Sequence, residues 1–215
     1  MIRALLVALA LLFAPTLCAQ HGEQAMHHGF SGAERWSKVF DDPARDTWQK
    51  PVEVVRALEL APEATVADIG SGTGYFAVRL ARAVPRGRVY GADIEPDMVR
   101  FLNERAAREG LANLRAVLAT ERGPNLPAPV DLVLLVDTYH HIGRRGEYFT
   151  VLKKMLAPGG RVAIIDFRSD SPVGPPARHR IAPRTVTEEM ARAGYRLAGE
   201  HVFLPNQYFL IFAAR

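Results

Sequence analysis

Thr65-Val66-Ala67-Asp68-Ile69-Gly70-Ser71-Gly72-Thr73-Gly74 is the most informative stretch of this 215-residue chain. Its first five residues are typical of a short buried strand, and they run directly into a Gly-x-Gly-x-Gly loop. An apolar pattern of helical spacing then continues to about Val84. Glycines at a strand-to-helix turn let backbone N–H groups and the positive end of the helix approach a ligand without interference from a Cβ atom. The stretch therefore predicts a ligand-binding turn at the carboxyl end of a strand.

An acidic residue at the end of the next expected strand adds to this signal. Strand 88–93 ends at Asp93, which lies 19 residues after Gly74. In a parallel sheet a carboxylate at that place can accept hydrogen bonds from both hydroxyls of a ribose, so the two features together predict a nucleoside-containing cofactor. The loop alone is less specific, because Gly72–Ala77 also fits the Gly-x-Gly-x-x-Ala form of a dinucleotide fingerprint, and its glycines could serve only a tight turn.

Strand and helix patterns alternate through the rest of the chain. After Asp93 we expect helices at 95–109, 146–156 and 187–193 and strands at 114–119, 131–136 and 161–166. Repeated units of this length are typical of parallel strands joined by right-handed crossovers. The last two strands, Tyr195–Phe203 and Tyr208–Phe212, are separated by four residues and must pair antiparallel, because parallel strands need a longer connection.

Three further segments are expected outside these units. Ser31-Gly32-Ala33-Glu34 has the spacing of a capping box and predicts a short helix with Trp36, Val39 and Phe40 on one face. A second helix is expected at Pro51–Leu60. A loop at Phe167–Pro183 carries four prolines, and loops of that length in compact domains are usually functional or mobile.

The first residues have the layout of a secretory signal. Arg3 precedes an apolar stretch, Ala4–Ala14, and small residues follow up to Ala19, so we expect residues 1–19 to be removed and the protein to be exported, to the periplasm. The apolar stretch is too short to leave a stable membrane span. If translation starts at Met26 instead, the protein would be cytoplasmic. We expect residues 20–45 to form an N-terminal segment and residues 46–215 to form one domain.

Composition sets limits on the partners. Lys and Arg number 27 against 23 Asp and Glu, and the basic residues are scattered along the helical stretches, so no nucleic-acid surface is indicated. The single cysteine, Cys18, lies in the expected signal, which leaves no thiol nucleophile and no cysteine-ligated zinc in the exported chain.

Four stretches in a fixed order carry a resemblance to a known family. They are Val66–Gly74, Asp93-Ile94-Glu95 with Met98, Asp131-Leu132-Val133 and Leu156–Gly160, and together they resemble the successive motifs of class I S-adenosylmethionine-dependent methyltransferases. The likeness is greatest to the small-molecule branch that includes the ubiquinone/menaquinone methyltransferases, and it covers about residues 46–215. It implies an α/β fold with a Rossmann-like seven-stranded sheet, mostly parallel with a C-terminal antiparallel strand, and helices on both faces. It also implies S-adenosylmethionine as cofactor and a small-molecule methyl acceptor as partner.

The resemblance assigns cofactor contacts to residues at four strand ends. The methionine part would contact the loop and the strand before it, Asp93 would hold the ribose hydroxyls, and Ile94 would lie against the adenine. Thr120 stands where the family often has an Asp facing the adenine amine, which leaves that contact open, and Asp137 would face the methyl end. The full set is Asp68, Gly70, Ser71, Gly72, Gly74, Asp93, Ile94, Thr120 and Asp137.

Candidate catalytic residues follow the fourth strand. Methyl transfer from a sulfonium needs little acid–base help, but a base adds roughly 10² to 10⁴-fold when the acceptor must lose a proton. His140 and His141 are the best candidates because histidine titrates near neutral pH, and Tyr139 could orient an acceptor. The alternative is that one histidine packs structurally while the other caps a loop. Asp166, at the next strand end, could contact an acceptor or form a structural ion pair.

Two other functions stay open on the sequence alone. The fourth strand lacks the Asn/Asp-Pro-Pro-Tyr signature of amino-directed DNA methyltransferases, and no Pro-Cys is present for cytosine C5 chemistry. A non-catalytic protein that binds S-adenosylmethionine or a nucleoside would keep the same pocket. An NAD(P)-dependent oxidoreductase is permitted by the Gly-x-Gly-x-x-Ala overlap. An exported enzyme would also need a supply of a cofactor that is made in the cytosol.

Overall fold

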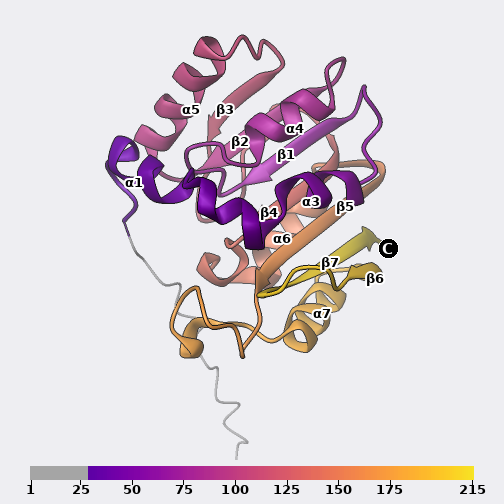
Figure 1. Ribbon diagram of the computed structural model, residues 1–215. Coiled ribbons are helices and arrows are strands. Elements are labelled where there is room, and N and C mark those ends of the chain that lie inside the picture. The colour runs from indigo at the N-terminus through magenta and orange to yellow at the C-terminus, as the bar shows by residue number, and fades with distance from the viewer. Residues whose placement is uncertain (1–28) are drawn as a thin grey trace, which may run out of the picture.

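The computed structural model describes residues 29–215, in which a single seven-stranded sheet is covered by helices on both faces (Figure 1). The expected signal and Met26 lie outside the described residues. In sheet order the strands are β3 (Leu114–Leu118), β2 (Arg88–Asp93), β1 (Thr65–Ile69), β4 (Val130–Val136), β5 (Leu156–Phe167), β7 (Gln207–Ala214) and β6 (Tyr195–His201). Neighbours from β3 to β5 pair in parallel, and β7 runs antiparallel to both β5 and β6. The predicted fold class is confirmed.

The helices divide between the two faces according to the pleat of the central strands. Leu132 and Leu134 of β4 pack with α3 (Pro51–Ala57), α4 (Ala77–Ala83) and α5 (Pro96–Arg108). Val133 and Leu135 point the other way and pack with α6 (Arg145–Lys153) and α7 (Pro183–Arg192). Because both faces are covered, β4 is apolar at nearly every position, as expected for a central parallel strand. Among residues 29–215 no helix is long and apolar enough to cross a membrane.

Four element predictions need correction. The helix expected at 146–156 is α6, which ends at Lys153. The helix expected at Pro51–Leu60 ends at Ala57. The strand expected at 161–166 is β5, which begins already at Leu156. Leu156 pairs with Val130, and a shift of register before the next pair, Leu132 with Arg161, accommodates the Pro-Gly-Gly residues. The last helix begins at Pro183, four residues before the expected start, because a proline with its fixed φ and missing N–H suits the first turn of a helix.

The predicted capping box is also wrong. Helix α1 (Ala33–Phe40) starts after Gly32, which has a φ of 88°, and no side chain of its own segment caps it. Instead Asp97, in the first turn of α5, accepts hydrogen bonds from the backbone N–H groups of Gly32 and Ala33, the latter at 3.1 Å. The N-terminal segment is therefore attached to the domain through the helix that follows β2.

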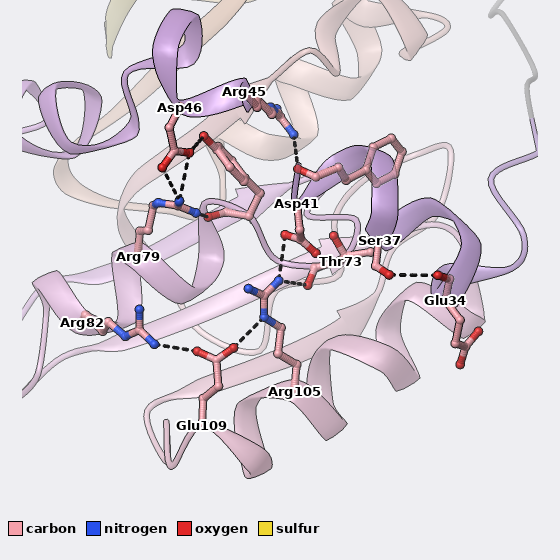
Figure 2. A network of polar contacts seen from close by, with 12 residues as sticks. Glu34, Ser37, Asp41, Arg45, Asp46, Thr73, Arg79, Arg82, Arg105 and Glu109 are labelled. Atoms are coloured by element: carbon pink, nitrogen blue, oxygen red, sulfur yellow. Dashed lines mark hydrogen bonds and ion pairs between the residues drawn. The ribbon is translucent and has the colours of Figure 1, made fainter. Parts of the chain in front are cut away.

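Two short helical segments complete the path from α1 to α3. A 3₁₀ turn at Pro43–Arg45 leads into α2 (Asp46–Gln49). Figure 2 shows two ion pairs between this segment and the helices that cover the sheet. Asp41 pairs with Arg105 of α5 at 2.9 Å, and Asp46 pairs with Arg79 of α4 at 3.2 Å. The segment before residue 46 therefore contacts the domain through α5.

Candidate functional site

A cavity of about 1020 Å³ opens where β1, β2 and β4 end. The strand order reverses at β1: β2 and β3 follow it on one side of the sheet, and β4 and β5 follow it on the other. In open α/β sheets the loops diverge there and leave a crevice for a ligand. The glycine loop, the ends of β2 and β4, the N-terminal segment and the loop after β5 all contribute to the lining. The cavity is at the upper end of the range for small-molecule sites, so it has room for two ligands side by side.

The glycine loop is shaped so that only glycine fits at two positions. Gly70 has a φ of 71°, and a Cβ there would lie 2.3 Å from Thr138 Oγ1. Gly74 has a φ of 98°, and a Cβ there would lie 2.3 Å from Leu102 Cδ1. A side chain at either place would push apart β4 and α5, which flank the loop. Gly74 serves this packing and does not line the cavity, whereas Gly70 and Gly72 do.

Asp93 is fixed against the glycine loop. Its Oδ2 accepts a hydrogen bond from the Gly72 N–H at 2.7 Å, and its Oδ1 accepts one from the Glu95 N–H at 3.0 Å. Burial raises the pKa of this carboxyl. Ile94, beside it, is 51% exposed on the cavity rim, where an apolar side chain suits the face of a flat ring. Both residues line the cavity.

Two polar groups on the cavity wall have no partner within the described chain. Ser71 Oγ and Thr73 Oγ1 are buried and make no hydrogen bond. Buried hydroxyls are normally satisfied, so this pair favours a polar ligand at the loop. Asp68 lies below the loop, and burial together with the nearby Asp93 raises its pKa to about 7. Thr120 also lines the cavity, and its hydroxyl donates to the Gly123 carbonyl at 3.1 Å.

Asp137 belongs to a closed ring of hydrogen bonds that the sequence did not predict. Arg45 Nε donates to Gln49 Oε1 at 3.2 Å, and Gln49 Nε2 donates to Gln207 Oε1 at 2.6 Å. Gln207 Nε2 then donates to Asp137 Oδ1, and Arg45 Nη2 donates to Asp137 Oδ2 at 3.4 Å. The Arg45 guanidinium also lies 4.2 Å from the centre of the Tyr75 ring. Residues far apart in the sequence therefore meet at the end of β4.

The two carboxyls with raised pKa values predict a pH dependence of stability. Desolvation raises the pKa of Asp137 to about 7, against the opposing effect of Arg45, and the pKa of Asp68 is about 7 as well. Between the two pKa values the folded protein keeps protons that the unfolded chain has lost. The contribution of these carboxyls to the free energy of unfolding is therefore complete below the unfolded-state pKa and is lost as pH rises through about 7. We expect the melting temperature of the cofactor-free protein to fall by several degrees between about pH 5 and pH 8. Asp137→Asn should reduce this fall, whereas exposed Asp170→Asn should leave it unchanged; an equal slope in both variants would contradict the prediction.

His140 and Asp166 form a buried pair beside the cavity. His140 Nδ1 lies 2.9 Å from both carboxylate oxygens of Asp166, and the His140 backbone N–H also donates to Asp166 Oδ2 at 3.2 Å. The Phe167 N–H donates to the other oxygen at 2.8 Å. A carboxylate at Nδ1 holds the proton on that nitrogen and leaves Nε2 as the basic one. Asp166 therefore pairs with His140 and does not itself line the cavity.

The other two catalytic candidates have different surroundings. The His141 ring lies 4.2 Å from the His140 ring and 5.5 Å from the ring of Phe30, and it lines the cavity. Tyr139 does not: its hydroxyl donates to Glu189 Oε2 at 2.6 Å, and its ring packs on Phe149 in the core. The expected acceptor-orienting place of Tyr139 is therefore corrected, because its side chain points to α7 rather than to the crevice.

Aromatic side chains cover the cavity from the N-terminal segment. Phe30, Trp36 and Phe40 form a cluster with ring centres 5.1 to 5.8 Å apart. The Phe30 N–H donates to Glu95 Oε1 at 3.1 Å, while its ring contacts the ring of His141, so Phe30 bridges the segments that follow β2 and β4. We call residues 29–33 the strap. On the far side, the rings of Trp48 and Phe167 lie 6.0 Å apart.

Comparison with known proteins gives consistent matches over most of the chain. Residues 60–197 match the model of a family described as "Methyltransferase domain". Demethylmenaquinone methyltransferase of Geobacillus sp. (strain WCH70) is 24% identical over 163 residues, which cover 72% of this chain and 68% of the relative. The ubiquinone/menaquinone biosynthesis C-methyltransferase UbiE of Bordetella parapertussis is 28% identical over 179 residues, covering 73% and 69%. A SAM dependent methyltransferase from Aquifex aeolicus superposes with a TM-score of 0.79 at 25% identity, over 86% of this chain and 99% of that structure.

Proposed function

The chain belongs to the methyltransferase domain family, and on that premise we propose that it methylates a small-molecule acceptor with His140 as the base. It is an S-adenosylmethionine-dependent methyltransferase with the Rossmann-like fold of that class. The observation that carries the proposal is the presence, in one cavity, of the glycine loop closed by Asp93 and of a histidine held by a buried carboxylate.

The residues of the cavity fit this cofactor in shape and in charge. S-adenosylmethionine carries a sulfonium and an ammonium against one carboxylate, which gives it a net positive charge. Acidic side chains in the lining outnumber basic ones: they are Asp68, Asp93, Glu95, Glu121 and Asp137 against Arg45 and Arg144. The unpartnered hydroxyls of Ser71 and Thr73 offer hydrogen bonds to the methionine part, and Arg45 is the cation placed to meet its carboxylate. Asp93 would take the ribose hydroxyls.

The protein's own chemical task is proton removal and alignment. When bound, S-adenosylmethionine supplies a methyl group on an activated sulfonium. An acceptor hydroxyl or amine must lose a proton as it is methylated, and Nε2 of His140 is the group that would accept it. Asp166 stabilises the resulting imidazolium, because its carboxylate lies 2.9 Å from Nδ1. The walls of the cavity would align the acceptor with the methyl group. Positioning of this kind lowers the activation barrier by on the order of 7–11 kcal/mol in favourable cases.

The remaining space favours a small and largely apolar acceptor. Beyond the cofactor loop, the cavity is bounded by Trp48, Phe167, Pro175 and Pro176, with the aromatic cluster of the N-terminal segment above. These walls offer no fixed charge to a substrate. A macromolecular acceptor would also meet the strap, whose Phe30 ring contacts His141.

The proposal is tested with the full chain in two steps. Calorimetric titration with S-adenosylmethionine, with NADH as the control, should show binding of the first compound only. Formation of S-adenosylhomocysteine is then measured by mass spectrometry with a panel of phenols, hydroquinones, thiols and secondary amines. Turnover with any of these supports an enzyme. Binding without turnover across the panel would favour the non-catalytic alternative, and binding of NADH alone would favour an oxidoreductase.

We also propose that residues 1–19 direct export and that the catalytic domain works outside the cytosol. The charged start, the short apolar stretch and the small residues up to Ala19 support this. The mass of the protein recovered from the periplasm of a bacterial host should correspond to a chain that begins at Gln20. Recovery of the full-length mass from the cytosol would contradict it.

A further inference from the structure

The loop between β5 and α7, residues 168–182, forms one wall of the cavity. Gly174, Pro175 and Pro176 line it next to Phe167. Phe167 directly follows Asp166, the carboxylate that holds His140. The shape of this wall therefore affects how a methyl acceptor would lie beside the proposed base, His140.

The side chain of Arg180 lies at the centre of the loop. Its guanidinium donates to five backbone carbonyls, all of them between residues 168 and 175. Nε donates to Pro175 at 2.8 Å, Nη2 donates to Val173 at 3.2 Å, and Nη1 is shared among Ser171 at 2.6 Å, Ser169 at 3.1 Å and Arg168 at 3.4 Å. The backbone of residues 168–175 is thus hydrogen-bonded to a single side chain.

The composition of the loop explains why an arginine is needed. Pro172, Pro175 and Pro176 have no backbone N–H, so the loop has few donors with which to satisfy its own carbonyls. A guanidinium brings five N–H groups in a rigid planar fork, which a lysine ammonium does not. Among residues 29–215 no carboxylate pairs with Arg180, so carbonyl dipoles are what balances its charge.

The loop is in close contact with the aromatic wall. Gly174 has a φ of 98°, and a Cβ at that position would lie 2.6 Å from Cδ1 of Phe167. The Phe167 ring in turn lies 6.0 Å from the ring of Trp48. Ser171 closes the intervening turn, since its hydroxyl donates to the Val173 carbonyl at 2.8 Å. A shift of the loop would therefore move the surface against which an acceptor packs.

We infer that Arg180 is a positioning residue for the methyl acceptor, which shapes the acceptor wall through the carbonyls of residues 168–175. The inference rests on the proposed function, because it takes the space beside His140 as the acceptor site. Most residues assigned to the cofactor lie instead at the ends of β1 and β2, and none of them lies in this loop. Loss of Arg180 should consequently weaken acceptor binding and leave cofactor binding intact.

The test compares Arg180→Ala with Arg178→Ala, a matched control from the same turn whose side chain is exposed. Hydrogen exchange is followed at the amides of Ser171 and Val173, and binding of 2-naphthol, a flat neutral probe, is measured by fluorescence in the presence of S-adenosylhomocysteine. In Arg180→Ala we expect exchange at these amides to speed up about tenfold and the probe to bind about tenfold more weakly, with the Kd for S-adenosylmethionine unchanged. Millimolar guanidinium chloride should restore both, and sodium chloride should not.

Each contrary result has a distinct meaning. Unchanged exchange at Ser171 and Val173 in Arg180→Ala would overturn the inference, and so would faster exchange with no loss of 2-naphthol binding or an equal effect in Arg178→Ala. Loss of S-adenosylmethionine binding along with loop protection would show a general structural role and would also overturn it. Failure of the wild-type protein to bind S-adenosylmethionine would count against the proposed function, and the exchange result would still decide whether Arg180 holds the loop.

Discussion

Asp93→Ala is expected to weaken the binding of S-adenosylmethionine by about 100-fold or more. Hydrogen bonds to a charged group contribute roughly 1.5–3 kcal/mol each, and a ribose presents two hydroxyls to this carboxylate. The variant also leaves the Gly72 N–H without its acceptor, so the glycine loop itself is loosened. Calorimetric titration of the full chain measures the effect.

Asp131→Ala is the matched control for this experiment. Asp131 also accepts a backbone hydrogen bond, from the Thr65 N–H at 2.8 Å, but it lies at the opposite end of the sheet. This variant should bind the cofactor as the wild type does. If Asp93→Ala stays folded by circular dichroism and binds with wild-type affinity, the assignment of the ribose to Asp93 is wrong.

His140→Gln and Asp166→Asn are expected to lower kcat by roughly 10² to 10⁴-fold with a phenolic acceptor while the Kd for S-adenosylmethionine stays constant. Glutamine removes the basic nitrogen, and asparagine no longer holds the proton on Nδ1 or balances the imidazolium. Steady-state formation of S-adenosylhomocysteine gives kcat, and calorimetry gives the Kd.

An acceptor that is already ionised provides the decisive control. A thiolate needs no base, so His140→Gln should barely change its rate. His141→Gln should have a smaller effect than His140→Gln with the phenol, because Asp166 is placed on His140. An equal loss with thiol and phenol would show that His140 shapes the site and does not take the proton.

The order of strands and helices followed from local sequence patterns, and so did the glycine loop, whereas the seven-stranded sheet was implied by the resemblance to a known family. The boundaries of β1 and β2 were predicted to the residue, because a short apolar run, a glycine turn and an amphipathic helix can each be recognised in consecutive residues. The acidic residue at the end of β2 was predicted for the same reason. Pro183 was misread, since proline marks both the end of a loop and the first turn of a helix.

The parts that could not be predicted depend on contacts between distant residues. Arg45 meets Asp137 across 92 positions, and Gln49 meets Gln207 across 158. A single polar residue has no periodicity, so nothing in the sequence linked these four side chains. The cap of α1 is a similar case: the acid that replaces the capping box is Asp97, 64 to 65 residues away.

The strap has a practical consequence for anyone who handles the protein. Gly29 lines the cavity, so the chain that leads into it, with any affinity tag fused to its start, is attached beside the space proposed for donor and product. The C-terminus is a safer attachment point: Ala213 of β7 pairs with Arg161 of β5, so the chain ends at the opposite end of the strands from the cavity. A tag there leaves turnover measurements free of an artefact that would otherwise look like slow product release.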